Sequence, residues 1–369
     1  MNRLFRWKHT GLFLLALAAG ILPFAVPEVC AAALREGLAL CSGPLLLSLF
    51  PFLVVSRLLI QCPESDLLAL PFRLAAWGIG IRTPCAARVL CIGFLGGFAP
   101  AASAAAQAVR TGQLTAEEAD ALLPACICSG PSFVVLTVGQ SLLGSAELGV
   151  LLFASQITAN YLTAALLNRF AGVRSVKPGS AAPASPAPPR LDEILADAAI
   201  TYCKLCGFIL FFRMLAAGAG ALLPAGAGTL CSILLEVCSG CDLASRTGRW
   251  GSLLCCAALS VQGLSVLLQV RTICPPEMTL RPLYRSRLLH LPLSLALFYL
   301  LLPGGEADVF STLPARVLLM RRVPPDCALL VFAVCCMAAC TLRSGIRQVE
   351  QKQMARNAGG CCINSKTLL

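Results

Sequence analysis

Two short polar stretches lie inside long apolar runs of this chain, and each has the composition of a broken helix. They are Ser129–Ser132 (SGPS) and Gln262–Ser265 (QGLS). A glycine-rich, hairpin-like stretch precedes each one: Gly93–Gln107 (GFLGGFAPAASAAAQ) and Leu234–Ser245 (LLEVCSGCDLAS). Inside hydrocarbon an unpaired backbone amide is costly, so non-helical backbone persists there only beside protein or a polar cavity. One such pair in each half predicts a transporter built from repeats, with its binding site where the repeats meet.

The backbone and side chains of these four stretches predict a site for a small anion. Glycine-rich turns expose backbone N–H groups and helix N-termini carry partial positive charge, so both suit a negatively charged ligand. The candidate substrate-binding residues are Gly96, Gly97, Ser103, Gln107, Ser129, Ser132, Ser239, Gln262, Ser265 and Gln269. The alternatives are a close helix crossing through small residues and a proline kink whose serines bond back to their own helix. The Ala99-Pro100 step favours a hairpin, broken at that point, over a crossing.

Ionisable residues in the second half are candidates for ion coupling or for binding the anion. Glu236 is the candidate for coupling to a cation or proton, because a carboxylate at membrane depth is functional by default. The alternative for Glu236 is an interfacial salt bridge to Arg246 or Arg249, and this is the interpretation we favour for Asp242. Arg213 is either an anion ligand or an arginine whose side chain extends to the outer surface.

The chain has no residue set typical of an enzyme. Its only two histidines, His9 and His290, are both expected near loops or helix ends, so neither a catalytic triad nor a histidine-rich metal site is predicted. A Walker-type phosphate loop is missing from the sequence, so ATP hydrolysis would need another subunit. Most of the 21 cysteines lie in apolar runs, where they act as small hydrophobic residues. The Cys238–Cys241 pair (CxxC) alone is a weak redox or metal signal, so we predict no cofactor and no metal.

Composition identifies the elements that must position these residues. The chain is 57% hydrophobic and 13% charged, with a mean hydropathy of +0.80. Such values predict an all-α polytopic membrane protein with about eight transmembrane helices and two re-entrant hairpins in an inverted repeat. The expected spans are 11–31, 38–60, 122–143, 148–170, 200–223, 251–270, 288–302 and 327–342, with a short interfacial or half-helix at 67–81. The expected hairpins are 88–109 and 228–245.

A change in composition divides the chain. Residues 172–190 are rich in Pro, Ala and Ser and are expected to form a linker that does not pack. The expected order is an N-terminal transmembrane helix (1–36), a first gate-like repeat (37–171), the linker (172–190), and a second gate-like repeat (191–303). A C-terminal helix region (304–342) and a basic cytoplasmic tail (343–369) follow.

The distribution of basic residues predicts the orientation. Most of the 29 Lys and Arg residues, including Arg57, Arg110 and Arg287, fall on the cytoplasmic side if the N-terminus is inside. This agrees with the positive-inside rule for a cell-membrane protein with both termini in the cytoplasm. The first hairpin then enters from the cytoplasm and the second from outside. No basic stripe alternates with exposed aromatic residues, so the net charge of +11 does not predict nucleic-acid binding.

Five motifs in order resemble the YlbJ-type sporulation integral membrane proteins of the nucleoside-recognition (gate) group, which is distantly related to concentrative nucleoside transporters. The similarity covers about Ser42 to Leu302, most of the chain. The matching segments are Gly93–Gly97 (GFLGG), Gly112–Ala119 (GQLTAEEA), Ser129–Phe133 (SGPSF), Leu234–Gly240 (LLEVCSG) and Gln262–Val270 (QGLSVLLQV). Two departures stand out: Ile127-Cys128 replaces a polar pair, and Gln262 replaces a glycine. If the replaced residues bind the substrate in relatives, a different or weaker ligand is expected here.

The resemblance implies a role in endospore formation, in the membrane around the forespore, with dipicolinate as the transported dianion. Together with the broken helices it predicts a secondary transporter, working by an elevator or rocking motion, for a small organic anion. Expected partners are this anion, a coupling cation or proton, and the lipid bilayer, and a homo-oligomer is compatible with the sequence. The alternative is a membrane scaffold that recruits proteins for spore cortex or coat assembly through the linker or tail.

Overall fold

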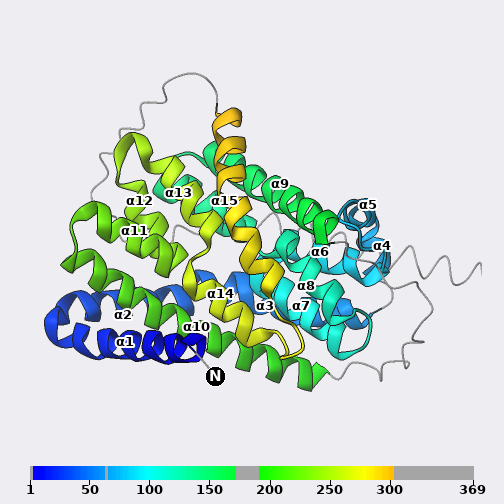
Figure 1. Ribbon diagram of the computed structural model, residues 1–369, viewed down its shortest axis with the longest axis horizontal. Coiled ribbons are helices and arrows are strands. Elements are labelled where there is room, and N and C mark those ends of the chain that lie inside the picture. Colours follow the sequence, from blue (N-terminus) through cyan, green and yellow to red (C-terminus); the bar gives the residue numbers. More distant parts are fainter. Residues whose placement is uncertain (1–2, 63–64, 172–190, 303–369) are drawn as a thin grey trace, which may run out of the picture.

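The chain is built from helices packed in several layers (Figure 1). The computed structural model describes residues 3–62, 65–171 and 191–302, and within these ranges there is no strand. Three described helical segments are long and apolar enough to cross a membrane: Ala146–Ala171, Leu191–Leu222 and Gly248–Ile273. The predicted linker, the predicted span at 327–342 and the predicted tail lie outside the described residues.

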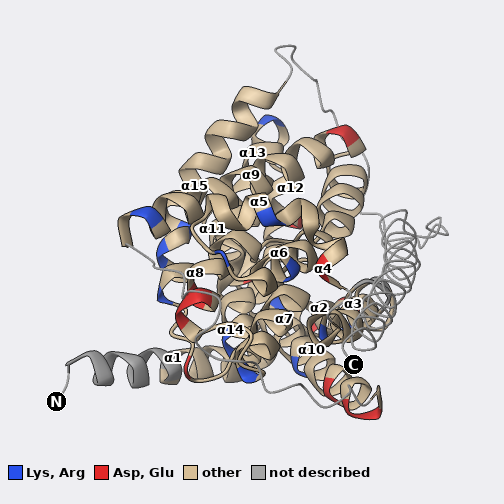
Figure 2. Cartoon of the chain, turned by 90° about the vertical axis from the view of Figure 1, so that its right-hand side faces the viewer, with Lys and Arg blue, Asp and Glu red and all other residues tan. Residues whose placement is uncertain are grey.

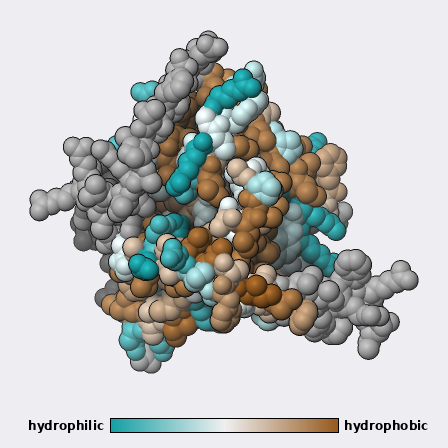
Figure 3. Space-filling view, turned by 90° about the vertical axis from the view of Figure 1, so that its left-hand side faces the viewer, coloured by the Kyte–Doolittle hydropathy of each residue, from teal (hydrophilic) through white to brown (hydrophobic). Residues whose placement is uncertain are grey.

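The surface of the described part agrees with a membrane environment. Large apolar side chains are exposed on several helices, among them Phe24 at 88% and Phe170 at 85%. Apolar residues cover much of the face in Figure 3, and Figure 2 shows charged residues as isolated points along mostly uncharged helices. In water such a surface would cause aggregation, whereas lipid tails solvate it.

The first two predicted spans are each interrupted. Helix α1 (Arg3–Ala25) meets α2 (Pro27–Ser42) at an angle of 108°, and α3 (Pro44–Gln61) begins after Gly43. The predicted spans at 11–31 and 38–60 are therefore not continuous helices. A proline disfavours helical backbone in the residue before it, and it has no N–H to donate within a helix. Pro27 and Pro44 therefore each start a new helix.

The first half continues with a hairpin, a broken span and a long helix. After the short α4 (Ser65–Leu68) and α5 (Leu70–Gly78), the elements are α6 (Pro84–Gly96), α7 (Phe98–Arg110), α8 (Ala116–Cys126), the π-helix η1 (Ser132–Leu142) and α9 (Ala146–Ala171). Helix α6 packs along α7, so the chain reverses between them. A Thr115–Glu118 capping box starts α8, with Thr115 Oγ1 accepting from the backbone N–H of Glu118.

The second half repeats this order. Its elements are α10 (Leu191–Leu222), α11 (Ala225–Leu235), α12 (Val237–Ser245), the 3₁₀ turn η2 (Gly248–Trp250), α13 (Gly251–Val261), α14 (Gly263–Ile273) and α15 (Arg281–Leu301). Helices α11 and α12 pack against each other as a hairpin, while α13 and α14 continue as one broken span. A hairpin, a broken span and a long helix therefore occur in both halves.

The two halves also pack on each other in a reciprocal way. The second helix of each hairpin contacts the second helix of the other half's broken span: α7 packs on α14, and α12 packs on η1. The first helix of each broken span contacts the other half's long helix, α8 on α15 and α13 on α9, and α9 packs on α15. Exchanging the two halves reproduces this set of contacts.

Close backbone contact between η1 and α9 leads to a first prediction. A Cβ added at Gly149 would lie 2.7 Å from Val135 Cα and 2.8 Å from its carbonyl oxygen, and backbone cannot give way as a side chain can. We expect Gly149→Ala to destabilise the protein by about 1–3 kcal/mol. Gly207, inside α10, has no atom within 4 Å of such a Cβ, so Gly207→Ala should stabilise by about 0.5–1 kcal/mol. Thermal unfolding in detergent would measure both, and equal effects would contradict the packing argument.

Candidate functional site

The two breaks of the first half touch each other. Between α6 and α7, Gly97 adopts φ +80° and ψ −164°, a region essentially restricted to glycine. A Cβ there would lie 2.7 Å from the backbone nitrogen of Gly130, within the non-helical stretch that separates α8 from η1. The hairpin therefore breaks at Gly97 and not at Ala99-Pro100 as predicted. Pro100 fits inside the first turn of α7, where a backbone N–H has no intrahelical partner in any case.

The two breaks of the second half touch in the same way. Gln262, at φ +65°, and Gly263, at φ +67°, separate α13 from α14. A Cβ on Gly263 would lie 3.0 Å from the nitrogen of Glu236, the residue between α11 and α12. The breaks at Gly97 and Glu236 lie within the two predicted hairpins, and the other two lie at the predicted broken helices. Each half places its pair of breaks in contact.

Glu236 caps the N-terminus of the second helix of its hairpin. Its Oε1 accepts from the backbone N–H of Cys238 at 2.9 Å, and its Oε2 accepts from that of Ser239 at 2.7 Å. The side chain is buried, so an interfacial salt bridge to Arg246 or Arg249 was wrong for this residue. That interpretation is confirmed for Asp242, whose carboxylate pairs with Arg246 at 2.8 Å.

Buried hydrogen-bond acceptors follow the second break along α14. Gln269 donates through Nε2 to Ser265 Oγ at 2.9 Å, and both residues are buried. The Oε1 atoms of Gln262 and Gln269 have no hydrogen-bond partner among the described residues. A buried carbonyl oxygen without a partner costs free energy. These two oxygens can therefore accept a hydrogen bond from water or a ligand, or bind a cation.

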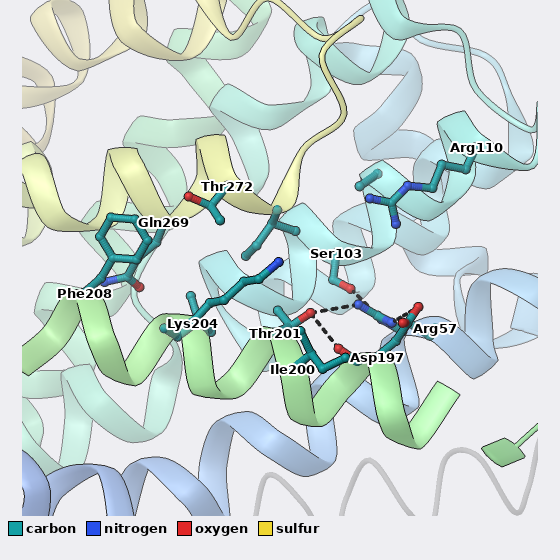
Figure 4. A pocket seen from close by; sticks show the side chains of 13 residues that line it. Arg57, Ser103, Arg110, Asp197, Ile200, Thr201, Lys204, Phe208, Gln269 and Thr272 are labelled. Atoms are coloured by element: carbon teal, nitrogen blue, oxygen red, sulfur yellow. Dashed lines mark hydrogen bonds and ion pairs between the residues drawn. The ribbon is translucent and has the colours of Figure 1, made fainter. Parts of the chain in front are cut away.

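A cavity of about 140 Å³ lies where the halves meet, between α3, α7, α10 and α14 (Figure 4). Ser103 and Gln269, both predicted ligands, contribute polar groups from opposite halves. Figure 4 shows Lys204 reaching from α10 into this cavity and Arg110 approaching it from α7. The polar lining residues are Arg57, Ser103, Arg110, Asp197, Thr201, Lys204, Gln269 and Thr272.

The cavity is positively charged. Arg57 is 7% exposed and is held by Asp197 at 2.8 Å, by Thr201 Oγ1 at 3.0 Å and by Ser103 Oγ at 3.2 Å. Asp197 itself is largely exposed, so water screens its charge. Arg110 and Lys204 form no ion pair with any described residue. Three cations therefore face one screened carboxylate, and an anion entering the cavity would be attracted.

The structure groups most of the predicted ligands into three places. Gly96, Gly97 and Ser129 lie at the first pair of breaks; Ser239, Gln262 and Ser265 lie at the second pair; and Ser103 and Gln269 line the cavity. Gln107 and Ser132 are half-buried and do not line the cavity. Whether any of these residues binds a substrate stays a prediction.

The three basic residues of the cavity are not among the ligands predicted from the sequence. Arg57 and Arg110 fall among the charges expected on the cytoplasmic side, and Lys204 lies near or within a predicted span. Arg57 carried a usable signal, because an arginine inside the predicted span 38–60 is a functional candidate by default. Lys204 and Arg110 carry no such signal, since only the packing of α14 on both α7 and α10 brings them to the same cavity.

The structure gives Arg213 a partner near the surface, because it donates to the largely exposed Glu36 Oε2 at 2.7 Å and so links α10 to α2. The expected position of His290 near a loop or helix end was wrong. Arg287 and His290 lie inside α15 and are buried, not in a loop or near a helix end. Within the described ranges no group of three or more His, Cys, Asp or Glu is placed to hold a metal ion.

The apolar surface and the helices of spanning length define the class: this is a helical, membrane-embedded protein. Comparison with models of protein families, with curated proteins and with solved structures finds no match to the chain.

Proposed function

We propose that the protein is a secondary transporter that moves a small organic anion across a bacterial cell membrane. In this proposal α6–α7 and α11–α12 are re-entrant hairpins of an inverted repeat within about eight spans, with both termini in the cytoplasm. The observation that carries the proposal is the cavity shared by both halves, where Arg57, Arg110 and Lys204 outnumber Asp197. A cavity formed by two repeats is where transporters of this architecture bind their cargo.

The reciprocal packing of the halves supports a mechanism. Helices α7 and α14 each belong to a different half and both line the cavity, so relative motion of the halves changes its access. The breaks at Gly97 and Gln262 allow short helices to move without unfolding a full span. Rocking of one half against the other around the bound anion would then expose it to each side in turn.

Spore formation is the proposed context, by resemblance to the sporulation membrane proteins described above. A dianion such as dipicolinate suits a cavity with a surplus of two positive charges, and its ring nitrogen and carboxylates can accept from Lys204, Arg110 and Arg57. A coupling cation or proton would supply the driving force. Glu236 remains the candidate for that coupling, although both of its oxygens already accept backbone N–H groups.

Uptake of dipicolinate into proteoliposomes tests the proposal. We expect Lys204→Ala and Arg110→Ala each to raise the apparent KM about 2–5-fold, because each removes an exposed charge worth up to ~1 kcal/mol, and the double variant to raise it about 10-fold. Arg169→Ala is the matched control, since Arg169 is an exposed arginine at the end of α9 that does not line the cavity. Its KM should be unchanged.

The same assay separates the transporter from a scaffold. Proteoliposomes that show no flux of dipicolinate, nucleosides or other small anions would contradict the transporter. If a chain with residues 181–188 deleted keeps its flux but fails to support sporulation, recruitment through the linker is a second activity of the protein. Equal KM values for the cavity variants and for Arg169→Ala would remove the cavity as the anion site.

A further inference from the structure

A second charged group lies at the centre of the molecule, away from the cavity. Arg287 projects from α15 and is 8% exposed, and no carboxylate among the described residues pairs with it. All of its contacts are to neutral oxygens. They are Ser286 Oγ at 3.2 Å, Asn160 Oδ1 at 3.1 Å, and the backbone carbonyls of Ile127 at 3.4 Å, Ser260 at 3.5 Å and Pro124 at 3.5 Å.

The three carbonyls belong to the C-terminal ends of two interrupted helices. Pro124 and Ile127 lie at the end of α8, and Ser260 lies at the end of α13. The last four carbonyls of a helix have no intrahelical partner, and they carry the negative end of the helix dipole. Here both ends are buried by the interruptions, so water cannot compensate them. A cation between them removes this cost for both helices at once.

The distances indicate charge–dipole attraction more than hydrogen bonding. Contacts of 3.4–3.5 Å between guanidinium nitrogens and carbonyls are long for a hydrogen bond. Attraction between a full charge and two aligned helix ends remains strong at such separations when the surroundings are apolar. The site therefore has the chemistry of a carbonyl-lined cation site, of the kind that unwound helices form for inorganic cations.

We infer that Arg287 is a built-in cation that occupies a carbonyl-lined site between the broken spans of the two halves. Its guanidinium holds the ends of α8 and α13 together, in the place where carbonyls without such a side chain would bind an inorganic cation. The inference does not depend on the cargo. Its consequence for transport rests on the proposed function: transport needs no inorganic cation between the ends of α8 and α13.

Thermal unfolding of the full-length protein in detergent tests the inference without any transport assay. We expect Arg287→Ala to lower the melting temperature by on the order of 5 °C or more, because two buried helix ends lose their counter-charge. Guanidinium chloride at tens of millimolar should restore at least half of this loss by filling the vacated space. Urea at the same concentration has a similar planar shape but no charge and should restore none, and neither solute should stabilise the unmodified protein.

Two more variants keep the inference testable if Arg287→Ala does not fold. Arg287→Lys keeps the charge on a shorter side chain, and Arg287→Met keeps much of the volume without it. We expect the melting temperatures to fall in the order Arg, Lys, Met. A Met variant as stable as the Lys variant, or guanidinium stabilising the Ala variant no more than urea does, would show that packing and not charge is what the site requires.

Discussion

Replacing Gly97 by alanine is expected to disrupt the fold of the first half more than Gly149→Ala does, because strain in the backbone adds to the close contact. The backbone conformation of Gly97 costs a residue with a Cβ about 1–3 kcal/mol, and overpacking against the backbone of Gly130 adds about 1–3 kcal/mol. The combined loss of about 2–6 kcal/mol is comparable to the whole stability of many domains. We expect Gly97→Ala to express poorly or to melt at least 5 °C below the unmodified protein, as measured by thermal unfolding in detergent.

Gly112 supplies the matched control for this prediction. It also has a positive φ, +69°, but a Cβ there would meet no atom within 4 Å. Gly112→Ala should therefore show only the conformational part of the cost, about 1 kcal/mol. Gly263→Ala, at φ +67° and 3.0 Å from Glu236 N, should resemble Gly97→Ala. If Gly97→Ala and Gly112→Ala are equally stable, the contact between the two breaks of the first half is not important for the fold.

Removing the carboxylate of Glu236 should have the second largest effect. Glu236→Ala leaves the N–H groups of Cys238 and Ser239 without an acceptor in a half-buried position, at an expected cost of about 2–4 kcal/mol. Glu236→Gln keeps one acceptor oxygen of similar position and should cost about half as much. The loss would appear as a lower melting temperature, and transport should fall in proportion because α12 no longer starts at its native place.

A comparison with Asp242 separates capping from a general effect of charge. Asp242 pairs with Arg246 on the exposed side of α12, so Asp242→Asn should change stability by less than ~0.5 kcal/mol. Cation dependence of transport then decides the role of Glu236. A Glu236→Gln protein that keeps its fold but loses its dependence on the coupling cation or proton would make Glu236 a coupling residue as well as a cap.

The sequence alone determined the class of protein and the approximate place of most breaks in its hairpins and broken spans. Apolar runs with few charges require a lipid environment, and this follows from composition without any knowledge of packing. The breaks also depend on residues close to them in the sequence. Pro131 and Gly263 disfavour regular helix through their own backbone geometry. Glu236 caps the N–H groups of residues only two and three positions further on. The same local reasoning misplaced one break, at Ala99-Pro100, because a proline in a helix's first turn does not end it.

Only the tertiary structure decided which breaks meet and which charges share a cavity. Arg57 and Lys204 are separated by well over a hundred residues, and nothing in their neighbouring sequence indicates that α3 and α10 place them on one cavity. Arg287 reads as one more basic residue near the end of a span until α8 and α13 direct their carbonyl ends toward it. The reason is physical. Helix breaks are set by the few residues around them, whereas the electrostatic role of a side chain is set by whatever the fold brings within a few ångströms of it.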